Sequence, residues 1–364
     1  MVVGYSLGNR SDKEDDIKVL GESDPNVVLY SKALPVVLSK ICRNECSHCS
    51  FRKKKEGLTV PYTTIKLSKK FRKLGTREAF FVAGERPDKY SHVRALLDLW
   101  GFESYLDYVY TVSELAFLEG LIPVIDIGFL TPVEMKKMTE ICAAIKVMID
   151  VVETGRFGKF SEPQKRKLDL KYKTLEWAGK LKFPTVTGLL VGVGEDKAYR
   201  KDALQSIASI HKQYGTVHEV LIQNFVPDAG LSFANTSPPT KKVMLDTVGM
   251  ALEILPKNVP VVIPLDMNPD IEDFIKAGVR DLGRIMQDGK GLYLNKNMVD
   301  FEDIQNRIEA MGFSLQQRFP LRKEFIKNEM YSKKLGQVFD SYKYKIKKDE
   351  QERLKEAKMN SNVD

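Results

Sequence analysis

The order of local patterns along the chain limits its fold more than any other feature. Short runs of β-branched and other apolar residues alternate with longer segments whose apolar residues recur at helical spacing. The strand-like runs are residues 35–41, 79–82, 121–126, 144–149, 184–191, 217–225 and 259–264, with a weaker one at 279–282. The helical segments are residues 63–74, 93–99, 104–119, 132–142, 167–180, 197–214, 241–255 and 271–277. This alternation predicts a parallel sheet in an α/β protein.

Seven or eight such units are enough for a complete or partial TIM-type (βα) barrel, with a doubly wound open sheet as the alternative. In a barrel, reactive groups lie on the loops that follow the strands. We expect the barrel to occupy residues 31–300 and residues 1–30 to form a loosely packed leader. The strand–helix rhythm stops after residue 300, so we expect residues 301–364 to form a helical C-terminal extension.

Composition excludes several classes of protein. Hydrophobic residues make up 43% of the 364 residues, which is ample apolar surface to bury and excludes disorder of the whole chain. No apolar run approaches the roughly 18 residues of a membrane span. Residues 1–16 contain no segment typical of a signal peptide, so we expect a cytoplasmic protein. The net charge of +8 allows a nucleic-acid partner, but half of it lies in the mixed-charge segment 321–364, which is typical of a solvated helix.

Three of the four cysteines stand close together, directly after the first predicted strand. Cys42, Cys46 and Cys49 have the spacing C-x3-C-x2-C. A disulfide scaffold would spread its cysteines through a secreted chain, whereas clustered thiolates are soft ligands suited to iron or zinc. A structural zinc site needs four protein ligands. A 4Fe-4S cluster held by three cysteines leaves one iron able to bind a small molecule.

Two residues are candidates for a fourth ligand. His48 lies between two of the cysteines, where it is poorly placed to bind the same ion. Cys142 ends a predicted helical segment, and a small buried apolar role suits it better. The cysteine pattern therefore favours a three-cysteine cluster over a zinc site.

Glycines and polar residues follow several other strands. Gly84-Glu85-Arg86-Pro87 follows the second strand, although a plain turn explains it equally well. Asp150, with Glu153 as a competitor, follows the fourth, and a solvated carboxylate is the alternative there. Gly188, Gly192 and Gly194 in and after the fifth strand lack the G-x-G-x-x-G order of a dinucleotide loop. Gln223 and Asn224 end the sixth strand.

The cysteine spacing on the first loop of a βα barrel resembles the radical S-adenosylmethionine superfamily. The resemblance implies that the cluster binds S-adenosylmethionine and cleaves it to methionine and a 5'-deoxyadenosyl radical, which abstracts hydrogen from a substrate. It further implies that Gly84 and Glu85 hold the methionine amino group and that Asp150 binds the ribose hydroxyls. The segment from Gly188 through Gly192 to Glu195 would pass beneath the adenine.

A narrower resemblance covers most of the chain, from about Tyr30 to about Leu294. Its ordered segments are Tyr30-Ser31-Lys32, Cys42-Arg43-Asn44, Gly84-Glu85-Arg86-Pro87, Thr187 to Glu195, and Gln223-Asn224-Phe225. Together they are similar to the cyclising subunit in the 7,8-didemethyl-8-hydroxy-5-deazariboflavin synthase family. This implies a lyase that closes the deazaflavin ring of a hydroxybenzyl–ribityliminouracil adduct, with release of ammonia, in coenzyme F(420) biosynthesis. It also implies a companion radical enzyme that supplies the tyrosine-derived adduct, and an external electron donor.

The substrate side of the family pattern is less well kept than the cofactor side. Asp126 stands where the family has Asn in Pro-His-x-Asn-x-Gly, Asp228 begins the segment that replaces Lys-x-Gly-Thr, and Arg284 replaces the last glycine of Asp-Trp-Gly-Gly. We expect the substrate rim to contain Asp126, Gln223, Asn224, Asp228 and Arg284. These departures keep open a related radical enzyme acting on a different small molecule.

A third hypothesis is a metal-bearing nucleic-acid-binding protein. Basic residues interleaved with aromatic ones would favour it. Tyr342-Lys343-Tyr344-Lys345 is the one stretch of that kind, so nucleic acid is the least favoured partner.

Overall fold

Eight parallel strands form a closed barrel in the computed structural model, which describes residues 24–44, 46, 48–53, 55–149, 162–228, 235–268, 270–285 and 300–344. The barrel closes where β1 pairs with β2, and the strands otherwise follow one another in chain order. The predicted α/β barrel is therefore confirmed, and it is complete. The strands are β1 Val27–Ser39, β2 Glu78–Ala83, β3 Ile122–Asp126, β4 Ala144–Lys146, β5 Thr185–Val191, β6 Val217–Asn224, β7 Val261–Val262 and β8 Asp281–Ile285.

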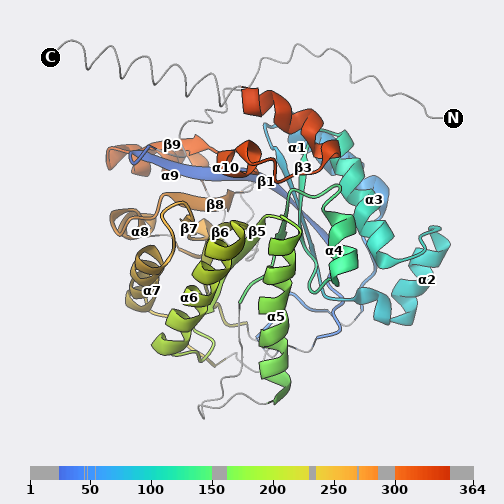
Figure 1. Cartoon of the computed structure of the whole chain (residues 1–364), viewed down its shortest axis with the longest axis horizontal. Helices are drawn as coiled ribbons and strands as arrows, with labels where there is room; N and C mark the ends of the chain where they lie inside the picture. Colours follow the sequence, from blue (N-terminus) through green and yellow to red (C-terminus); the bar gives the residue numbers. More distant parts are fainter. Residues whose placement is uncertain are drawn as a thin grey trace.

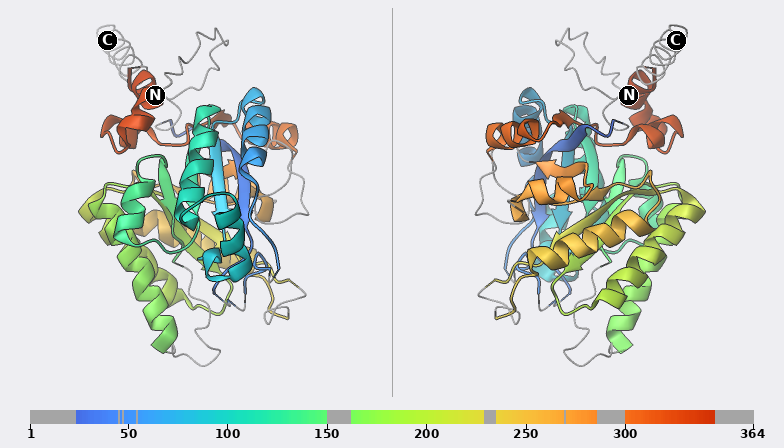
Figure 2. Two further views of the ribbon diagram at one scale, coloured as in Figure 1. Left: turned by 90° about the vertical axis from the view of Figure 1, so that its right-hand side faces the viewer. Right: turned by 90° about the vertical axis from the view of Figure 1, so that its left-hand side faces the viewer.

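Helices surround the barrel (Figure 1) and lie along the outside of the strands in both side views (Figure 2). They are α1 Pro61–Lys73, α2 Ser91–Leu99, α3 Tyr105–Leu118, α4 Pro132–Met138, α5 Glu162–Lys180, α6 Lys197–Tyr214, α7 Lys241–Ile254 and α8 Ile271–Lys276. Local sequence fixes their ends. Thr131 and Glu134 form a capping box at α4, and Gly215 ends α6 with a positive φ of 69°. Among the described residues, no helix combines the length and apolarity that crossing a membrane requires.

The first strand and the C-terminal segment differ from their predicted outlines. β1 begins at Val27 rather than at residue 35, and its first four residues are buried. The segment after residue 300 contains α9 Phe301–Ala310 and α10 Lys323–Lys327, but also a strand, β9 Ser314–Gln317. β9 pairs in parallel with β1 over Val27–Tyr30, on the edge that β2 occupies further along. Its polar sequence carries no strand-like alternation, so the pattern did not reveal it.

The interior of the barrel is built in rows of side chains. Pro35, Phe80, Val124 and Ala144 are in register across β1 to β4, and three of them share one buried interior cluster with Ala33. Neighbouring residues on the same strands, such as Phe81 and Ile125, point outward and pack beneath the helices. The row nearer the amino ends of the strands combines the apolar residues Ala33 and Ile122 with the charged residue Glu78.

A charged group, the floor network, consists of Glu78, Glu219 and Asp281 with Arg284, Arg318 and Arg322. Arg318 is fully buried and donates to Glu219 at 2.6 Å and to Asp281 at 2.8 Å. Because Arg318 and Arg322 lie beyond β9, the C-terminal segment closes the amino-terminal end of the barrel. Removing charges from water is costly, and close pairing offsets that cost here.

Candidate active site

The cysteine loop is fastened to the end of β2. The backbone N–H of Glu85 donates to Cys42 Sγ at 3.2 Å, and the N–H of Asn44 donates to the same sulfur at 3.4 Å. The N–H of Arg43 donates to the Glu85 carbonyl at 2.9 Å, and the Tyr90 hydroxyl donates to the Cys42 carbonyl at 3.1 Å. The first and second loops at this end of the barrel thus form one unit.

Gly84 permits this close approach. A Cβ atom at this position would lie 2.2 Å from the Ile41 carbonyl oxygen and 2.6 Å from Cys42 Cβ. Both distances are shorter than side-chain carbons tolerate, so any other residue would push the cysteine loop away from β2. Gly84, which the family resemblance associates with the methionine amino group, therefore makes room for the cysteine loop.

Three thiols lie on this loop without a disulfide. Cys42, Cys46 and Cys49 are each partly exposed, and the N–H of Cys49 closes a turn on the Cys46 carbonyl at 3.2 Å. Among the residues that the structure describes, no group of three or more His, Cys, Asp or Glu side chains is already arranged as a metal site. Even so, three soft donors, one of which accepts two backbone N–H groups, suit an iron–sulfur cluster.

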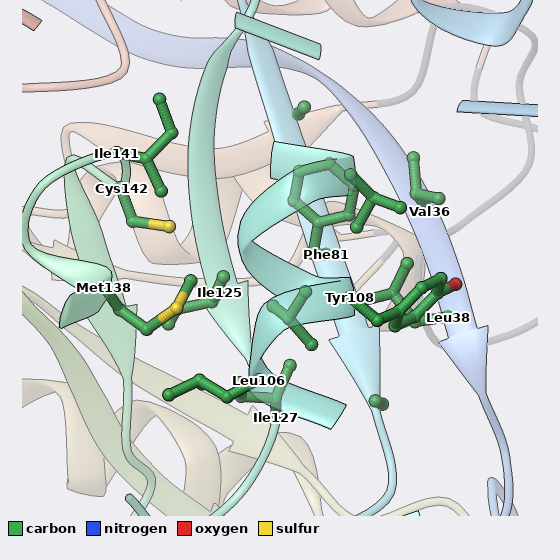
Figure 3. Close-up of a cluster of buried hydrophobic side chains, with 14 of the residues drawn as sticks. Val36, Leu38, Phe81, Leu106, Tyr108, Ile125, Ile127, Met138, Ile141 and Cys142 are labelled. Carbon is green, nitrogen blue, oxygen red and sulfur yellow. The ribbon is translucent and has the colours of Figure 1, made fainter. Parts of the chain in front are cut away.

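Cys142 lies apart from that loop. It is buried among apolar side chains that include Met138 and Ile141 (Figure 3). Burial raises the pKa of its thiol to about 12. Its expected role as a small buried side chain is confirmed.

Glu85 is held between the first and third loops. Its carboxylate accepts from Arg43 Nε at 2.7 Å and from the Phe129 N–H at 3.2 Å, and its side chain is 16% exposed. Arg86, next in the chain, makes a two-pronged ion pair with Glu134 at the start of α4. Glu85 is therefore well fixed, and a ligand ammonium would share its charge with Arg43.

The residues expected beneath the adenine have partners within the protein. Glu195 accepts from the N–H groups of Gly192 and Val193 and pairs with Arg200 at 2.9 Å. These contacts stabilise the loop that follows β5. A Cβ atom on Gly188, whose φ is 152°, would lie 1.9 Å from the Leu221 carbonyl oxygen. Packing between β5 and β6 alone accounts for that glycine.

Four of the five predicted rim residues lie at the carboxyl ends of strands or just beyond. Asp126 ends β3 and pairs with Lys146 at 3.0 Å. Asn224 ends β6, donates to the Met267 carbonyl and accepts from Asn268. Gln223 precedes Asn224 on β6 and is partly buried, and Asp228 is exposed beyond that strand.

Arg284 lies in the floor network, paired with Glu78 and Glu219, and the structure does not bring it to the rim. The predicted ribose ligand Asp150 and its competitor Glu153 lie outside the described residues. The sequence analysis overlooked Lys146. Its signal was a lone charge within the apolar stretch 141–149.

Curated relatives show the family of this chain, and solved structures share its fold. No protein-family model matches it. A curated protein named 7,8-didemethyl-8-hydroxy-5-deazariboflavin synthase from Archaeoglobus fulgidus is 33% identical over 319 residues, covering 87% of this chain and 97% of the relative. A protein of the same name from Methanococcoides burtonii is 32% identical over 322 residues, covering 87% of this chain and 96% of the relative.

Solved structures share the fold at lower identity. Methylornithine synthase (PylB) matches with a TM-score of 0.60 and 18% identity, covering 80% of this chain and 84% of that one. The FeFe-hydrogenase maturase HydG from Carboxydothermus hydrogenoformans also gives 0.60 and 18%, covering 84% of this chain and 71% of that one. The curated relatives establish more than the fold: this chain belongs to the 7,8-didemethyl-8-hydroxy-5-deazariboflavin synthase family.

Proposed function

We propose that this protein is a radical S-adenosylmethionine lyase of deazaflavin synthesis. Its substrate would be 5-amino-5-(4-hydroxybenzyl)-6-(D-ribitylimino)-5,6-dihydrouracil, and ring closure with release of ammonia would give 7,8-didemethyl-8-hydroxy-5-deazariboflavin for coenzyme F(420). The observation that carries the proposal is the family match over most of the chain, combined with three thiols on the loop that β2 holds in place.

Cys42, Cys46 and Cys49 would hold a 4Fe-4S cluster. With S-adenosylmethionine bound and one electron from an external donor, that cluster would supply a 5'-deoxyadenosyl radical. The protein's own part is to bind and orient. Glu85, fixed by Arg43 and Phe129, would accept a hydrogen bond from the methionine ammonium, a charge-assisted contact. Asp150 is proposed for the ribose hydroxyls.

The interior of the barrel suits radical chemistry because it keeps water away from one side. The apolar row that includes Phe80, Val124 and Ala144 is almost fully buried, and the floor network closes the amino-terminal end behind it. A substrate would therefore enter from the carboxyl end, where the cysteine loop lies. Binding, orientation and exclusion of side reactions are what a protein contributes when a cofactor carries the chemistry.

Product analysis tests the proposal directly. The anaerobically reconstituted protein would be incubated with the adduct, S-adenosylmethionine and dithionite, with the Cys42→Ala variant as the control. We expect the blue-green fluorescence and the mass of the deazaflavin, together with 5'-deoxyadenosine, from the unmodified protein alone. Robust 5'-deoxyadenosine without deazaflavin would overturn the substrate and point to a related enzyme with a different one.

Two partners belong to this proposal. The adduct requires a companion radical enzyme that builds it from tyrosine, and the cluster requires an external electron donor. Supplying both reactants chemically, as in the experiment above, separates the activity of this chain from that of its partners.

A further inference from the structure

Lys146 is a buried cation inside the barrel. It is the last residue of β4, and its side chain is 4% exposed. Its Nζ lies 3.0 Å from Asp126 Oδ2 and 5.8 Å from the centre of the Phe80 ring. Lysine is rarely buried to this extent unless it is paired.

The strand register places this pair in a row around the interior. Val37 of β1 is paired with Val82 of β2, and Val82 is paired with Asp126 of β3. Val124 is paired with Ala144 on β4, so Lys146, two residues further on, continues the row beside Asp126. Successive rows share one face because side chains alternate along a strand. The Asp126–Lys146 pair therefore lies one layer closer to the carboxyl end than the apolar row.

The row that contains Asp126 and Lys146 is partly exposed to solvent, whereas the apolar row beneath it is buried. Val37 is 37% exposed and the Asp126 side chain is 28% exposed, whereas Phe80 and Val124 are fully buried. The row also borders the cysteine loop. Phe129, three residues after Asp126, donates to the Glu85 carboxylate, and the N–H of Glu85 donates to Cys42 Sγ. A molecule bound on this row would lie on the cysteine-loop side of the barrel.

Packing does not require a charged pair at this level. The row beneath consists of apolar side chains, and a buried ion pair can often be replaced by apolar residues without loss of stability. What the pair provides is an ammonium donor directly beside a carboxylate acceptor. A ligand that presents a carbonyl next to an N–H has the complementary pattern.

We propose that Lys146 and Asp126 bind the adjacent carbonyl and N–H groups of a pyrimidinedione ring, and so select the substrate. This inference rests on the proposed function for the identity of the ring. Lys146 would donate to the ring carbonyl and Asp126 would accept from the ring N–H. Hydrogen-bonding sites of this kind reject analogues that leave their polar groups unpaired.

The test measures binding and turnover separately. Lys146→Met and Asp126→Leu, which remove the donor and the acceptor respectively, would be titrated calorimetrically with 6-(D-ribitylamino)uracil, using the reconstituted protein in the presence of S-adenosylmethionine. We expect each variant to bind this probe about tenfold to a hundredfold more weakly, the range for loss of a charge-assisted hydrogen bond. KM for the adduct should rise in parallel, while affinity for S-adenosylmethionine should not change.

Lys137→Met is the matched control, because it removes a Lys–Asp pair with Asp107 on the outside of the barrel. It should bind the probe as the unmodified protein does. Thermal unfolding would verify that the variants fold, and Lys146→Met, which removes the buried cation, carries the test if Asp126→Leu does not fold.

The outcomes distinguish this inference from the proposed function. Equal probe affinity in all variants, or no binding by the unmodified protein, overturns the inference. Absence of deazaflavin with probe binding that still depends on Lys146 overturns the proposed function and leaves the inference standing.

Discussion

The two ends of the barrel use the same kinds of charged side chain in opposite ways. At the amino-terminal end, Glu219 and Arg318 are almost completely buried and bind each other and further partners. At the carboxyl end, Arg43 and Asp126 are 37% and 28% exposed, and they pair with Glu85 and Lys146 respectively.

This difference assigns the charged residues of the amino-terminal end to stability and those of the carboxyl end to ligand binding. The C-terminal segment closes the amino-terminal end, and the charges of the floor network hold that segment to the strands. At the other end, each pair has a partly exposed member, Arg43 or Asp126, that can share its partner with a ligand. The division agrees with βα barrels in general, in which chemistry occurs at the carboxyl end and the opposite end provides stability.

Removing a cysteine of the loop should have the largest effect, confined to the carboxyl end. Replacement of Cys42, Cys46 or Cys49 by Ala should abolish cluster absorbance after reconstitution and all formation of 5'-deoxyadenosine, because each thiol would supply one iron ligand. Cys142→Ala is the control and should keep the cluster, since Cys142 is 2% exposed within the apolar core. Equal loss of iron in Cys142→Ala would refute the assignment of ligands.

Removing a cation of the floor should instead reduce stability. Arg318→Met leaves Glu219 and Asp281 buried with one partner fewer. Breaking a buried pair in this way typically costs about 3–5 kcal/mol in the free energy of unfolding, measured by chemical denaturation. Lys69→Met, which breaks a pair with Glu119 in which the lysine side chain is 62% exposed, should cost less than about 1 kcal/mol. Similar losses in both variants would contradict the stabilising role of the floor network.

The sequence predicted the carboxyl end better than the amino-terminal end, for a physical reason. Cys42, Gly84 and Glu85 stand on loops next to strands, where residue type and spacing report local chemistry, and the structure brings their loops together. The barrel followed from strand–helix alternation, which is also local information.

The floor network was not predicted because its members are far apart along the chain. Glu78 is bound by Arg284, 206 residues later, and no local pattern marks either residue as a partner. We expected Arg284 on the substrate rim because it aligns with a family motif. In the structure its side chain instead pairs with the buried carboxylates of Glu78 and Glu219. β9 escaped detection for the same reason, because its strand character comes from pairing with β1 and not from its own residues.

At the carboxyl end, Glu85→Gln should weaken S-adenosylmethionine binding without loss of the cluster. The substitution removes the charge that would meet the methionine ammonium, so the dissociation constant should rise about tenfold to a hundredfold. Equilibrium binding to the reconstituted protein measures it, with iron content as the check on the loop. Glu56→Gln is the matched control, because Glu56 is an exposed carboxylate whose Oε1 lies 3.9 Å from Lys40 Nζ. An unchanged dissociation constant in Glu85→Gln would remove Glu85 from the proposed site.

The smallest predicted effect is a pH dependence of stability that originates in the floor. His218 is fully buried beside Glu219, and its Nε2 accepts the backbone N–H of Arg322 at 3.1 Å. Burial lowers the pKa of His218 from 6.5 to about 4. Between these values the unfolded chain binds the proton and the folded chain does not, so stability falls as the pH falls through this window.

From about pH 7.5 to about pH 5.5, this one group should therefore cost about 1 kcal/mol of unfolding free energy. His218→Gln removes the titration while keeping a hydrogen-bond acceptor for Arg322. Glu219, which contacts His218, stays ionised over this range because Arg284 and Arg318 hold its pKa well below its usual value, so the difference in unfolding free energy between the two proteins isolates His218. That difference should move by about 1 kcal/mol in favour of the variant as the pH is lowered over this range. A difference that stays constant with pH would mean that His218 carries the same charge in the folded and unfolded chains, and that the barrel floor is open to protons.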